Sequence, residues 1–319
     1  DNCRHVCKDL ILSQDLVDQF TGRVANGVSK AFNRQNPVLE AETASLRITI
    51  VHESVCLTGR SICIRKSLPY VRLHARQMIA EGYCKEEVLD LLLSCVADHK
   101  NIVVVGEPGA GKTELCKFLS GYIPEDERVI TIEDAAELQL NHIENLVRME
   151  TREANAEGAG AIGIGELIRA ALRMRPDRII VGEVRGKEAL DLLQSLNTGH
   201  DGGFSSGHAN SVKDMLARLE TMVLMAADLS LPAIRSQIAS AVDVMVHVAR
   251  MRDKTRKITA IEEVDRFENG EIILNPLFAF RETKCPESRI GDRRKVEGSL
   301  ERVGALKHRE KLRLAGYDV

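Results

Sequence analysis

The sequence predicts an α/β protein in two parts: a small α+β domain over residues 1–67, followed by a mostly parallel α/β domain over residues 68–319. Two observations lead to this fold class. The first part combines one helical pattern with short alternating segments, whereas the second alternates buried apolar runs with amphipathic helical patterns. The chain length of 319 residues also suits about two domains of roughly 150 residues each.

In the N-terminal part, apolar residues at helical spacing predict one helix within residues 9–32. Two alternating segments, residues 46–51 and 61–65, are typical of half-buried strands. The Pro-containing segment 67–69 predicts a hinge. Because the chain begins at Asp1 and not at Met, we expect this domain to be truncated at its start. The apolar positions of the predicted helix are Leu12, Leu16, Phe20, Val24 and Val28.

The second part begins with a pattern of alternating helices and strands. Residues 86–97 predict an amphipathic helix, and the apolar run 101–105 is typical of a strand buried on both faces. Two similar runs, at 129–132 and 178–181, are each followed by an acidic residue within two positions. Ligands of open parallel sheets bind beyond the carboxyl ends of the strands. We therefore expect one site where these three strands end.

The C-terminal third predicts further alternation and then a charged extension. Residues 209–226 and 231–242 have helical patterns, and residues 244–248 and 257–261 resemble strands. Residues 281–319 contain 11 Lys or Arg against 7 Asp or Glu. We expect this last segment to be a partly helical appendage.

Composition excludes several functional classes. With 44% hydrophobic and 29% charged residues, the chain is neither a disordered protein nor a disulfide-stapled miniprotein. A net charge of -3, only 3% aromatic residues and no Trp argue against direct nucleic-acid binding. No apolar run approaches the roughly 18 to 20 residues of a membrane span. None of the eight cysteines forms a C-x-x-C pair, which argues against a zinc ribbon and favours a reducing compartment.

The strongest motif is GEPGAGKT at residues 106–113, which fits the phosphate-binding loop G-x-x-x-x-G-K-[ST] between a buried strand and a helix. Glycines let backbone amides approach phosphate oxygens, and the helix N-terminus favours the anion. Lys112 is expected to bridge the β- and γ-phosphates of ATP, and Thr113 to ligate Mg²⁺. The expected nucleotide-binding residues are Gly106, Glu107, Pro108, Gly109, Ala110, Gly111, Lys112, Thr113 and Glu114.

Acidic residues follow the other two buried strands. Glu133 or Asp134 is a candidate to hold the water shell of Mg²⁺ or to polarise the attacking water, although Asp134 is equally suited to cap a helix. Glu183 follows a Walker B-like strand in which Gly182 replaces the usual Asp. Its position suits a base that orients water toward the γ-phosphate. The alternative is an ordinary loop carboxylate paired with Arg185.

Two histidines, His200 and His208, lie eight positions apart in a Gly-rich segment after Glu183. They are candidates for sensing the γ-phosphate, with a purely structural loop as the alternative. No Cys or third His stands at the spacing of a metal site. Several arginines between residues 148 and 185 suit bidentate phosphate contacts, with exposed helix faces or salt bridges as the alternative for most of them.

Six blocks of sequence resemble the type II/IV secretion ATPase superfamily, and within it the CpaF/TadA-like tight-adherence (Tad/Flp) pilus assembly ATPases. The resemblance covers roughly residues 33 to 280. The blocks are GEPGAGKT at 106–113, ITIEDAAELQL at 130–140, LVRMETR at 146–152, ALRMRPDRIIVGEVRG at 171–186, LNTGHDGGFSSGHANS at 196–211 and RLETMVLMA at 218–226.

The resemblance implies a RecA-like P-loop ATPase domain working as a cytoplasmic homo-hexameric motor. Such a motor uses Mg-ATP hydrolysis to drive pilin assembly, through platform proteins of the inner membrane and without direct nucleic-acid binding. It assigns Glu133 and Asp134 to an Asp box, and Glu183 to the Walker B general base. It further assigns a His-box pair and phosphate-contacting arginines, some of them acting between subunits. These residues are His200, His208, Arg148, Arg169 and Arg173.

Three other functions remain open at this point. The first is a type IV secretion or conjugation ATPase of the same superfamily, which shares the core motifs. The second is a nucleotide-gated structural ring that scarcely hydrolyses ATP, consistent with Gly182. The third is a nucleic-acid translocase, which the low aromatic content and the acidic net charge disfavour. The lack of a tetracysteine insert argues against the type II secretion and type IV pilus branches.

Overall fold

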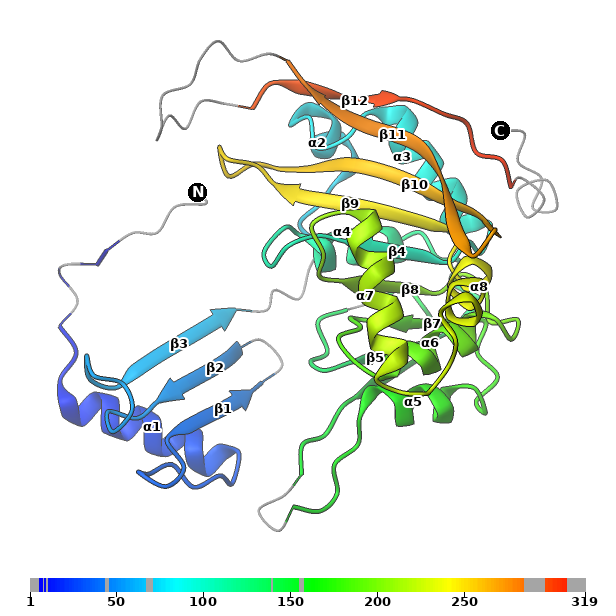
Figure 1. Ribbon diagram of the computed structural model, residues 1–319. Coiled ribbons are helices and arrows are strands. Elements are labelled where there is room, and N and C mark those ends of the chain that lie inside the picture. Colours follow the sequence, from blue (N-terminus) through cyan, green and yellow to red (C-terminus); the bar gives the residue numbers. More distant parts are fainter. Residues whose placement is uncertain are drawn as a thin grey trace. The chain divides into compact units, whose positions relative to one another are not determined.

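In the computed structural model the chain forms two compact units (Figure 1). One unit comprises residues 1–70 with 154–159, and the other comprises residues 71–153 with 160–319. The structure describes residues 6, 7, 9, 11–43, 46–66, 71–138, 140–154, 158–283 and 296–308.

The first unit packs one helix, α1 (Gln14–Gly27), against a three-stranded antiparallel sheet in the order β1-β2-β3. Ser13 caps α1 by accepting a hydrogen bond from the amide of Leu16. Alternate residues of the strands face the helix, and the core contains Leu39, Ala41, Ile48 and Ile50. The predicted helix and the two predicted strands are confirmed. The strands are β1 (Val38–Glu42), β2 (Leu46–Val51) and β3 (Ser61–Lys66).

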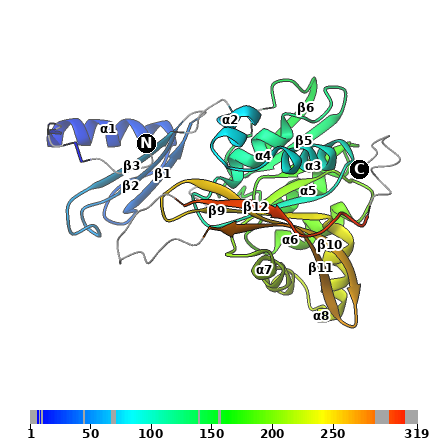
Figure 2. The ribbon, with the colours of Figure 1, turned by 90° about the horizontal axis from the view of Figure 1, so that it is seen from above.

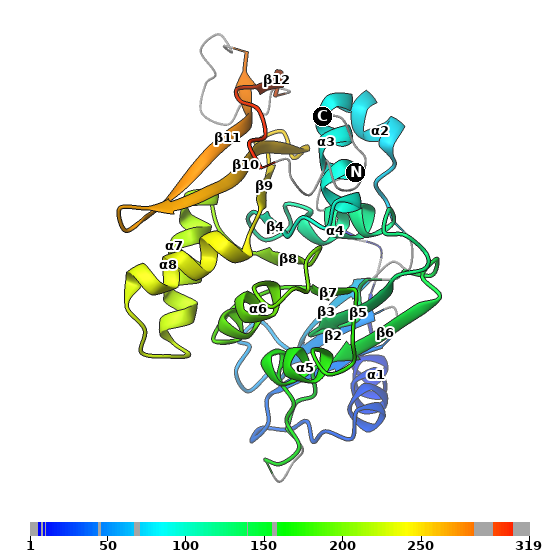
Figure 3. The same ribbon diagram turned by 90° about the vertical axis from the view of Figure 1, so that its right-hand side faces the viewer.

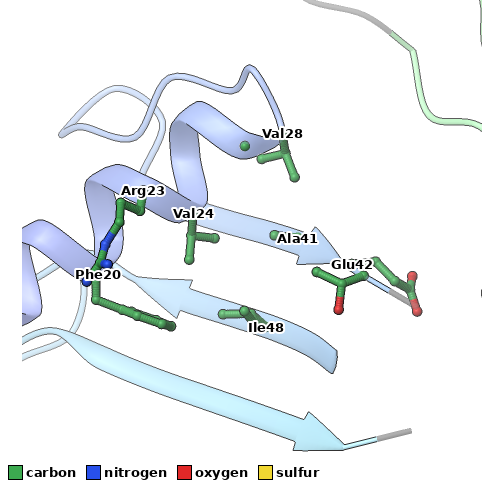
Figure 4. Close-up of a pocket in the computed structure, with 9 residues that line it drawn as sticks. Phe20, Arg23, Val24, Val28, Ala41, Glu42 and Ile48 are labelled. Atoms are coloured by element: carbon green, nitrogen blue, oxygen red, sulfur yellow. The ribbon is translucent and has the colours of Figure 1, made fainter. Parts of the chain in front are cut away.

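A cavity of about 420 Å³ lies within this first unit, between α1 and the sheet (Figure 4). Apolar side chains of α1, such as Phe20 and Val24, line it together with Ile48 of β2. Arg23 and Glu42 contribute its charged groups. None of the site residues predicted from the sequence lines this cavity.

The second unit is built on a nine-stranded sheet in the order β12-β11-β10-β9-β4-β8-β7-β5-β6. Neighbouring strands from β9 to β6 run parallel, and β9 to β12 are joined in antiparallel pairs. The strands are β4 (Ile102–Val105), β5 (Arg128–Glu133), β6 (Asn145–Glu150), β7 (Arg178–Val181), β8 (Phe204–Gly207), β9 (Val244–Arg250), β10 (Arg256–Glu268), β11 (Glu271–Glu282) and β12 (Gly298–Arg302).

Helices cover both faces of the parallel part of this sheet (Figure 3). Side chains alternate along β4, so Ile102 and Val104 join the core beneath α3 and α4, whereas Val103 and Val105 join the core beneath α5 to α8. Helix α8 also packs on β10 and β11 (Figure 2). The helices are α2 (Ala75–Ala80), α3 (Glu86–Ala97), α4 (Lys112–Ser120), α5 (Ile164–Ala171), α6 (Glu188–Leu196), α7 (Val212–Leu224) and α8 (Leu231–Ala241).

The C-terminal part differs from the prediction. The short strand expected at 257–261 is the first part of the 13-residue strand β10, which pairs with the 12-residue strand β11. Part of the expected helical appendage is instead the edge strand β12, in which Leu300 is buried and paired with Phe280. The many charges of this segment hide its alternation, because only one face of an edge strand is buried. The predictions for residues 284–295 and 309–319 lie outside the described residues.

The described cysteines, Cys7, Cys56, Cys63, Cys84, Cys95 and Cys116, are all free thiols. In the part of the chain that the structure describes, no helix is both long and apolar enough to cross a membrane. The hinge predicted at 67–69 falls outside the described residues.

Candidate active site

The phosphate loop connects the end of β4 to the start of α4, as its sequence predicts. Gly106 is required by close packing, because a Cβ there would lie 2.2 Å from the backbone oxygen of Val248. Gly109 and Gly111 have φ values of +77° and +102°, which lie in the left-handed region that favours glycine. The loop therefore turns sharply enough to direct the N-terminus of α4, and its free amides, toward an anion.

Lys112 is buried at the first position of α4 and points back into the loop. Its Nζ donates hydrogen bonds to the carbonyl oxygens of Gly106, at 3.0 Å, and Glu107, at 3.3 Å. The same ammonium lies 2.9 Å from Nδ1 of His208. Burial lowers the pKa of Lys112, and the carboxylate of Glu183 opposes this effect. The loop thus holds a cation where the phosphates of a nucleotide would lie.

Glu183 and His208 meet beside Lys112, because they follow the adjacent parallel strands β7 and β8. Nε2 of His208 lies 2.8 Å from Oε1 of Glu183, a close contact between polar atoms that lacks hydrogen-bond geometry. Burial, and then the charge of Lys112, lowers the pKa of His208. The ammonium of Lys112 can only donate, so Nδ1 of the neutral ring is the acceptor and Nε2 carries the proton toward Glu183. The three side chains form a continuous polar chain.

A second polar chain runs from Glu183 along the surface. Nη2 of Arg185 donates to Oε2 of Glu183 at 2.8 Å, and Nη1 lies 3.2 Å from Oδ2 of Asp134. Thr151 also donates its hydroxyl to Asp134. The pairing of Glu183 with Arg185, weighed above as an alternative to a catalytic role, therefore exists together with the contact to His208. Asp134 does not cap a helix, because the residues that the structure describes between it and β6 form none.

Glu133 is buried at the end of β5, beside the end of β7. Its Oε1 accepts hydrogen bonds from the amides of Glu137 and Leu138, each at 3.0 Å. Burial nevertheless raises its pKa to about 7. A Cβ on Gly182 would lie 3.1 Å from Cγ of Glu133. The glycine in place of the usual Walker B Asp therefore makes room for the carboxylate of the neighbouring strand.

The residues present are compatible with a magnesium ion held mainly by the nucleotide. Thr113 stands in the first turn of α4, and the carboxylates of Glu133 and Asp134 end the neighbouring strand β5. These are hard oxygen donors, which Mg²⁺ prefers, and in nucleotide sites they usually supplement phosphate oxygens and water. Across the described residues no three His, Cys, Asp or Glu side chains form a metal cage of their own.

His200 is not brought to the phosphate loop within the subunit. It lies before β8, whereas His208 follows the last residue of that strand. The four extended residues of β8 separate the two histidines, which lie beyond opposite ends of this strand. Nδ1 of His200 is 3.4 Å from the hydroxyl of Thr198.

The predicted arginines occupy three different positions. Arg148 donates from Nη2 to the carbonyl of Ala136 at 3.1 Å, and so supports the segment that follows Glu133. Arg169 is exposed and bonded to Asp191 at 2.7 Å. Arg173 is exposed just after the end of α5. Of the three, only Arg148 contacts the segment around the candidate site within the subunit.

Glu114 and Arg256 both differ from what the sequence suggested, since Glu114 makes its contacts away from the phosphates and Arg256 contacts the loop. Glu114 accepts a hydrogen bond from the backbone amide of Arg72 and lies 3.5 Å from Lys117, so it supports the base of α4. Arg256, which the sequence analysis missed, donates from Nε to the carbonyl of Gly109 at 2.9 Å. No local motif marks Arg256, because the pairing of β9 with β4 brings it to the loop.

A family model described as "Type II/IV secretion system protein" matches residues 34–303. The chain belongs to this family. A candidate conjugal transfer protein of Mycobacterium tuberculosis is 40% identical over 217 residues, which are 68% of this chain and 61% of that relative. The type IV secretion system protein PtlH of Bordetella pertussis is 41% identical over 164 residues, 50% of this chain and 48% of PtlH. This type II/IV secretion system protein thus spans about half to three fifths of those relatives.

Solved structures agree with the family at the level of the fold. The VirB11 ATPase of the Brucella suis type IV secretion system, solved with sulphate, is 31% identical and has a TM-score of 0.51, covering 79% of this chain and 81% of that one. The ATPase DotB of Legionella pneumophila shares the fold, with a TM-score of 0.54 at 17% identity over 80% of this chain and 68% of its own. The relatives named here are type IV secretion or conjugation proteins, whereas the sequence analysis gave first place to the tight-adherence pilus ATPases.

Proposed function

We propose that this secretion family member hydrolyses Mg-ATP as one subunit of a homo-hexameric motor, and that the motor powers a type IV secretion or conjugation machine. The observation that carries the proposal is the chain of contacts from Lys112 through His208 to Glu183. It joins a phosphate-binding cation to a carboxylate that can orient water. Phosphoryl transfer requires this kind of positioning and charge neutralisation more than covalent chemistry.

Each residue of this chain has a defined part in the proposed reaction. Lys112 leaves the carbonyls of Gly106 and Glu107 and binds the β- and γ-phosphates, while the loop amides neutralise the remaining charge. Glu183 accepts a proton of the attacking water and so aligns it with the γ-phosphate. Thr113 would hold Mg²⁺ together with nucleotide oxygens, and the bound ion would supply charge neutralisation for the phosphates.

His208 is the proposed sensor of the γ-phosphate. Its neutral ring contacts both Lys112 and Glu183, so movement of Lys112 onto a phosphate breaks a contact that His208 makes before binding. The segment after β8 then has two arrangements, one for each state of the nucleotide, and the reaction can be coupled to motion through them.

Completion of the site by a neighbouring subunit is part of the same proposal. Arg169 and Arg173 are exposed and lie on or just after α5, so in a ring they are available to a neighbour's nucleotide. Arg148 supports the Asp-box segment within its own subunit. Because His200 does not reach the phosphate loop of its own subunit, we assign its role to contacts between subunits of the ring.

The steady-state Mg-ATPase rate per subunit, measured against protein concentration, tests the motor. A rate that rises and then saturates supports sites completed between subunits. A constant rate, with monomers seen by size measurement at the lowest concentration, refutes the shared site. Nucleotide binding without hydrolysis at every concentration refutes the motor in favour of a nucleotide-gated structural ring. Stimulation by nucleic acid with a steep salt dependence favours a translocase.

The machine that the motor serves is a separate part of the proposal. The names of the relatives favour type IV secretion or conjugation, with the motor at the cytoplasmic face of the inner membrane beside platform proteins. The six sequence blocks favour a second candidate, assembly of tight-adherence pili. Deleting the gene in its native strain separates the two: loss of protein or DNA transfer with normal surface pili supports the first, and loss of pili supports the second.

A further inference from the structure

Arg256 contacts the phosphate loop, and the charges of Arg250 and Arg72 act on it, so we call these three residues the arginine cluster. Strand β9 lies beside β4, with His247 aligned to Val105, the last residue of β4. Because β9 continues to Arg250, the turn between β9 and β10 extends beyond the start of the phosphate loop. The register of the sheet therefore places arginines from a distant part of the sequence beside the phosphate loop.

Arg256 is the member of the cluster that contacts the loop directly. Its Nε donates to the carbonyl of Gly109 at 2.9 Å. A Cβ on Gly111 would lie 3.1 Å from its Cδ, so the aliphatic part of the side chain also packs against the loop. Arg250 is paired directly opposite Arg256 across the antiparallel β9–β10 ladder. The two guanidinium groups thus belong to one surface beside the loop.

The cluster concentrates like charges. Burial lowers the pKa of Arg256, and the charges of Arg250 and Arg72 lower it further, against weaker opposing effects from Tyr83 and Glu114. Like charges that face each other across an antiparallel pair destabilise it. A bound anion would remove this repulsion, and guanidinium groups bind phosphate oxygens with charge-assisted hydrogen bonds.

The order of the strands indicates which phosphate this anion is. Glu183 follows β7, and its partner His208 follows β8, so the γ-phosphate end of a nucleotide must face that flank of the loop. Strand β9 lies on the opposite flank of β4. The phosphate farthest from the reacting end is the α-phosphate, which joins the nucleoside.

We propose that the arginine cluster holds the α-phosphate of the bound nucleotide, with Arg256 exchanging its bond to Gly109 for bonds to the phosphate oxygens. This inference rests on the nucleotide binding proposed above. In this arrangement the arginine cluster positions the nucleotide, because the cluster contacts the end of the triphosphate that does not react. Contact with the base instead of the phosphate is the competing outcome of the test.

Isothermal titration calorimetry of the full chain with Mg-ATP, Mg-ADP and inorganic triphosphate tests the cluster. We expect Arg256→Ala to weaken all three ligands by about 10- to 100-fold, as for loss of a charge-assisted hydrogen bond. Arg250→Ala, at an exposed position, should weaken all three less strongly. Arg252→Ala is the matched control, because Arg252 lies in the same turn but pairs with Glu282. Its affinities should equal those of the wild type.

Three results would overturn the proposal, and each differs from failure of the proposed function. If the folded Arg256→Ala and Arg250→Ala variants bind all three ligands normally, the cluster has no ligand role. If ATP and ADP weaken while inorganic triphosphate does not, the cluster contacts the nucleoside. If Arg252→Ala weakens binding as much as Arg256→Ala, the effect belongs to the turn in general. The proposed function fails separately, when the wild type binds no nucleotide or Lys112→Ala binds as well as the wild type.

Discussion

Replacing the buried Glu133 by Gln tests the electrostatics of the candidate site. Burial raises the pKa of Glu133 from 4.5 to about 7 in the folded protein. Each pKa unit corresponds to about 1.4 kcal/mol, so the ionised carboxylate costs about 3 kcal/mol of folding free energy above pH 7. Gln keeps the shape and the acceptor oxygen for the amides of Glu137 and Leu138, but it does not ionise.

The sign of the pH dependence follows from the raised pKa. Between about pH 4.5 and pH 7 the folded state binds more protons than the unfolded state, so the stability contributed by Glu133 falls as pH rises. The penalty is almost absent below pH 4.5 and complete above pH 7. We therefore expect the stability of Glu133→Gln, relative to that of the wild type, to rise by about 2 to 3 kcal/mol when the pH is raised from 5 to 8.

Urea unfolding of both proteins at pH 5 and pH 8 measures this gain. Glu150→Gln is the matched control, because Glu150 is exposed and stands opposite Glu133 in the β5–β6 register. Its stability difference from the wild type should be the same at both pH values. A difference for Glu133→Gln that does not change with pH would refute the argument that burial raises this pKa.

Three further predictions concern the loop, the base and the core. Glu183→Gln should bind Mg-ATP normally and lower turnover by orders of magnitude in a steady-state assay, and near-normal turnover would contradict the base assignment. Gly106→Ala should lower stability by about 1 to 3 kcal/mol in urea unfolding, because its Cβ meets the carbonyl of Val248. Arg178→Ala should lower the free energy of unfolding by about 3 to 5 kcal/mol, because it leaves the carboxylate of Glu127 without its buried partner. Thermal unfolding measures this loss, and a smaller loss would show that water replaces the guanidinium group.

The sequence predicted those parts of the fold that are encoded locally. The run 101–105, the glycines of the phosphate loop and the helix after Lys112 are adjacent in sequence, so periodicity and motif located all of them. Glu183 was identified for the same reason, since it directly follows a buried strand. The sequence predicted that Glu183 and His208 both belong to the site, but it did not predict their contact. That contact depends on β7 and β8 being neighbours in the sheet.

The failures concern contacts and strand pairings between distant segments. The prediction grouped His200 with His208 because both lie in one Gly-rich stretch, but the intervening residues include the extended strand β8. Arg256 and β12 were missed because their places depend on antiparallel pairing with β9 and β11. A long-range register has no local sequence signal, and the charges of an edge strand conceal its single buried face.

The packing of Gly182 against Glu133 limits how this sequence can evolve. An Asp at position 182, as in an ordinary Walker B strand, would have its Cβ 3.1 Å from Cγ of Glu133, so the side chain of Glu133 would have to shift to admit it. Shortening Glu133 first removes a buried acceptor that two amides use. Each single step toward the ordinary pattern therefore disturbs the packing or the hydrogen bonds of Glu133, so we expect the two positions to change together. Lineages with the Gly-Glu strand end are expected to retain it together with a long carboxylate at the neighbouring strand.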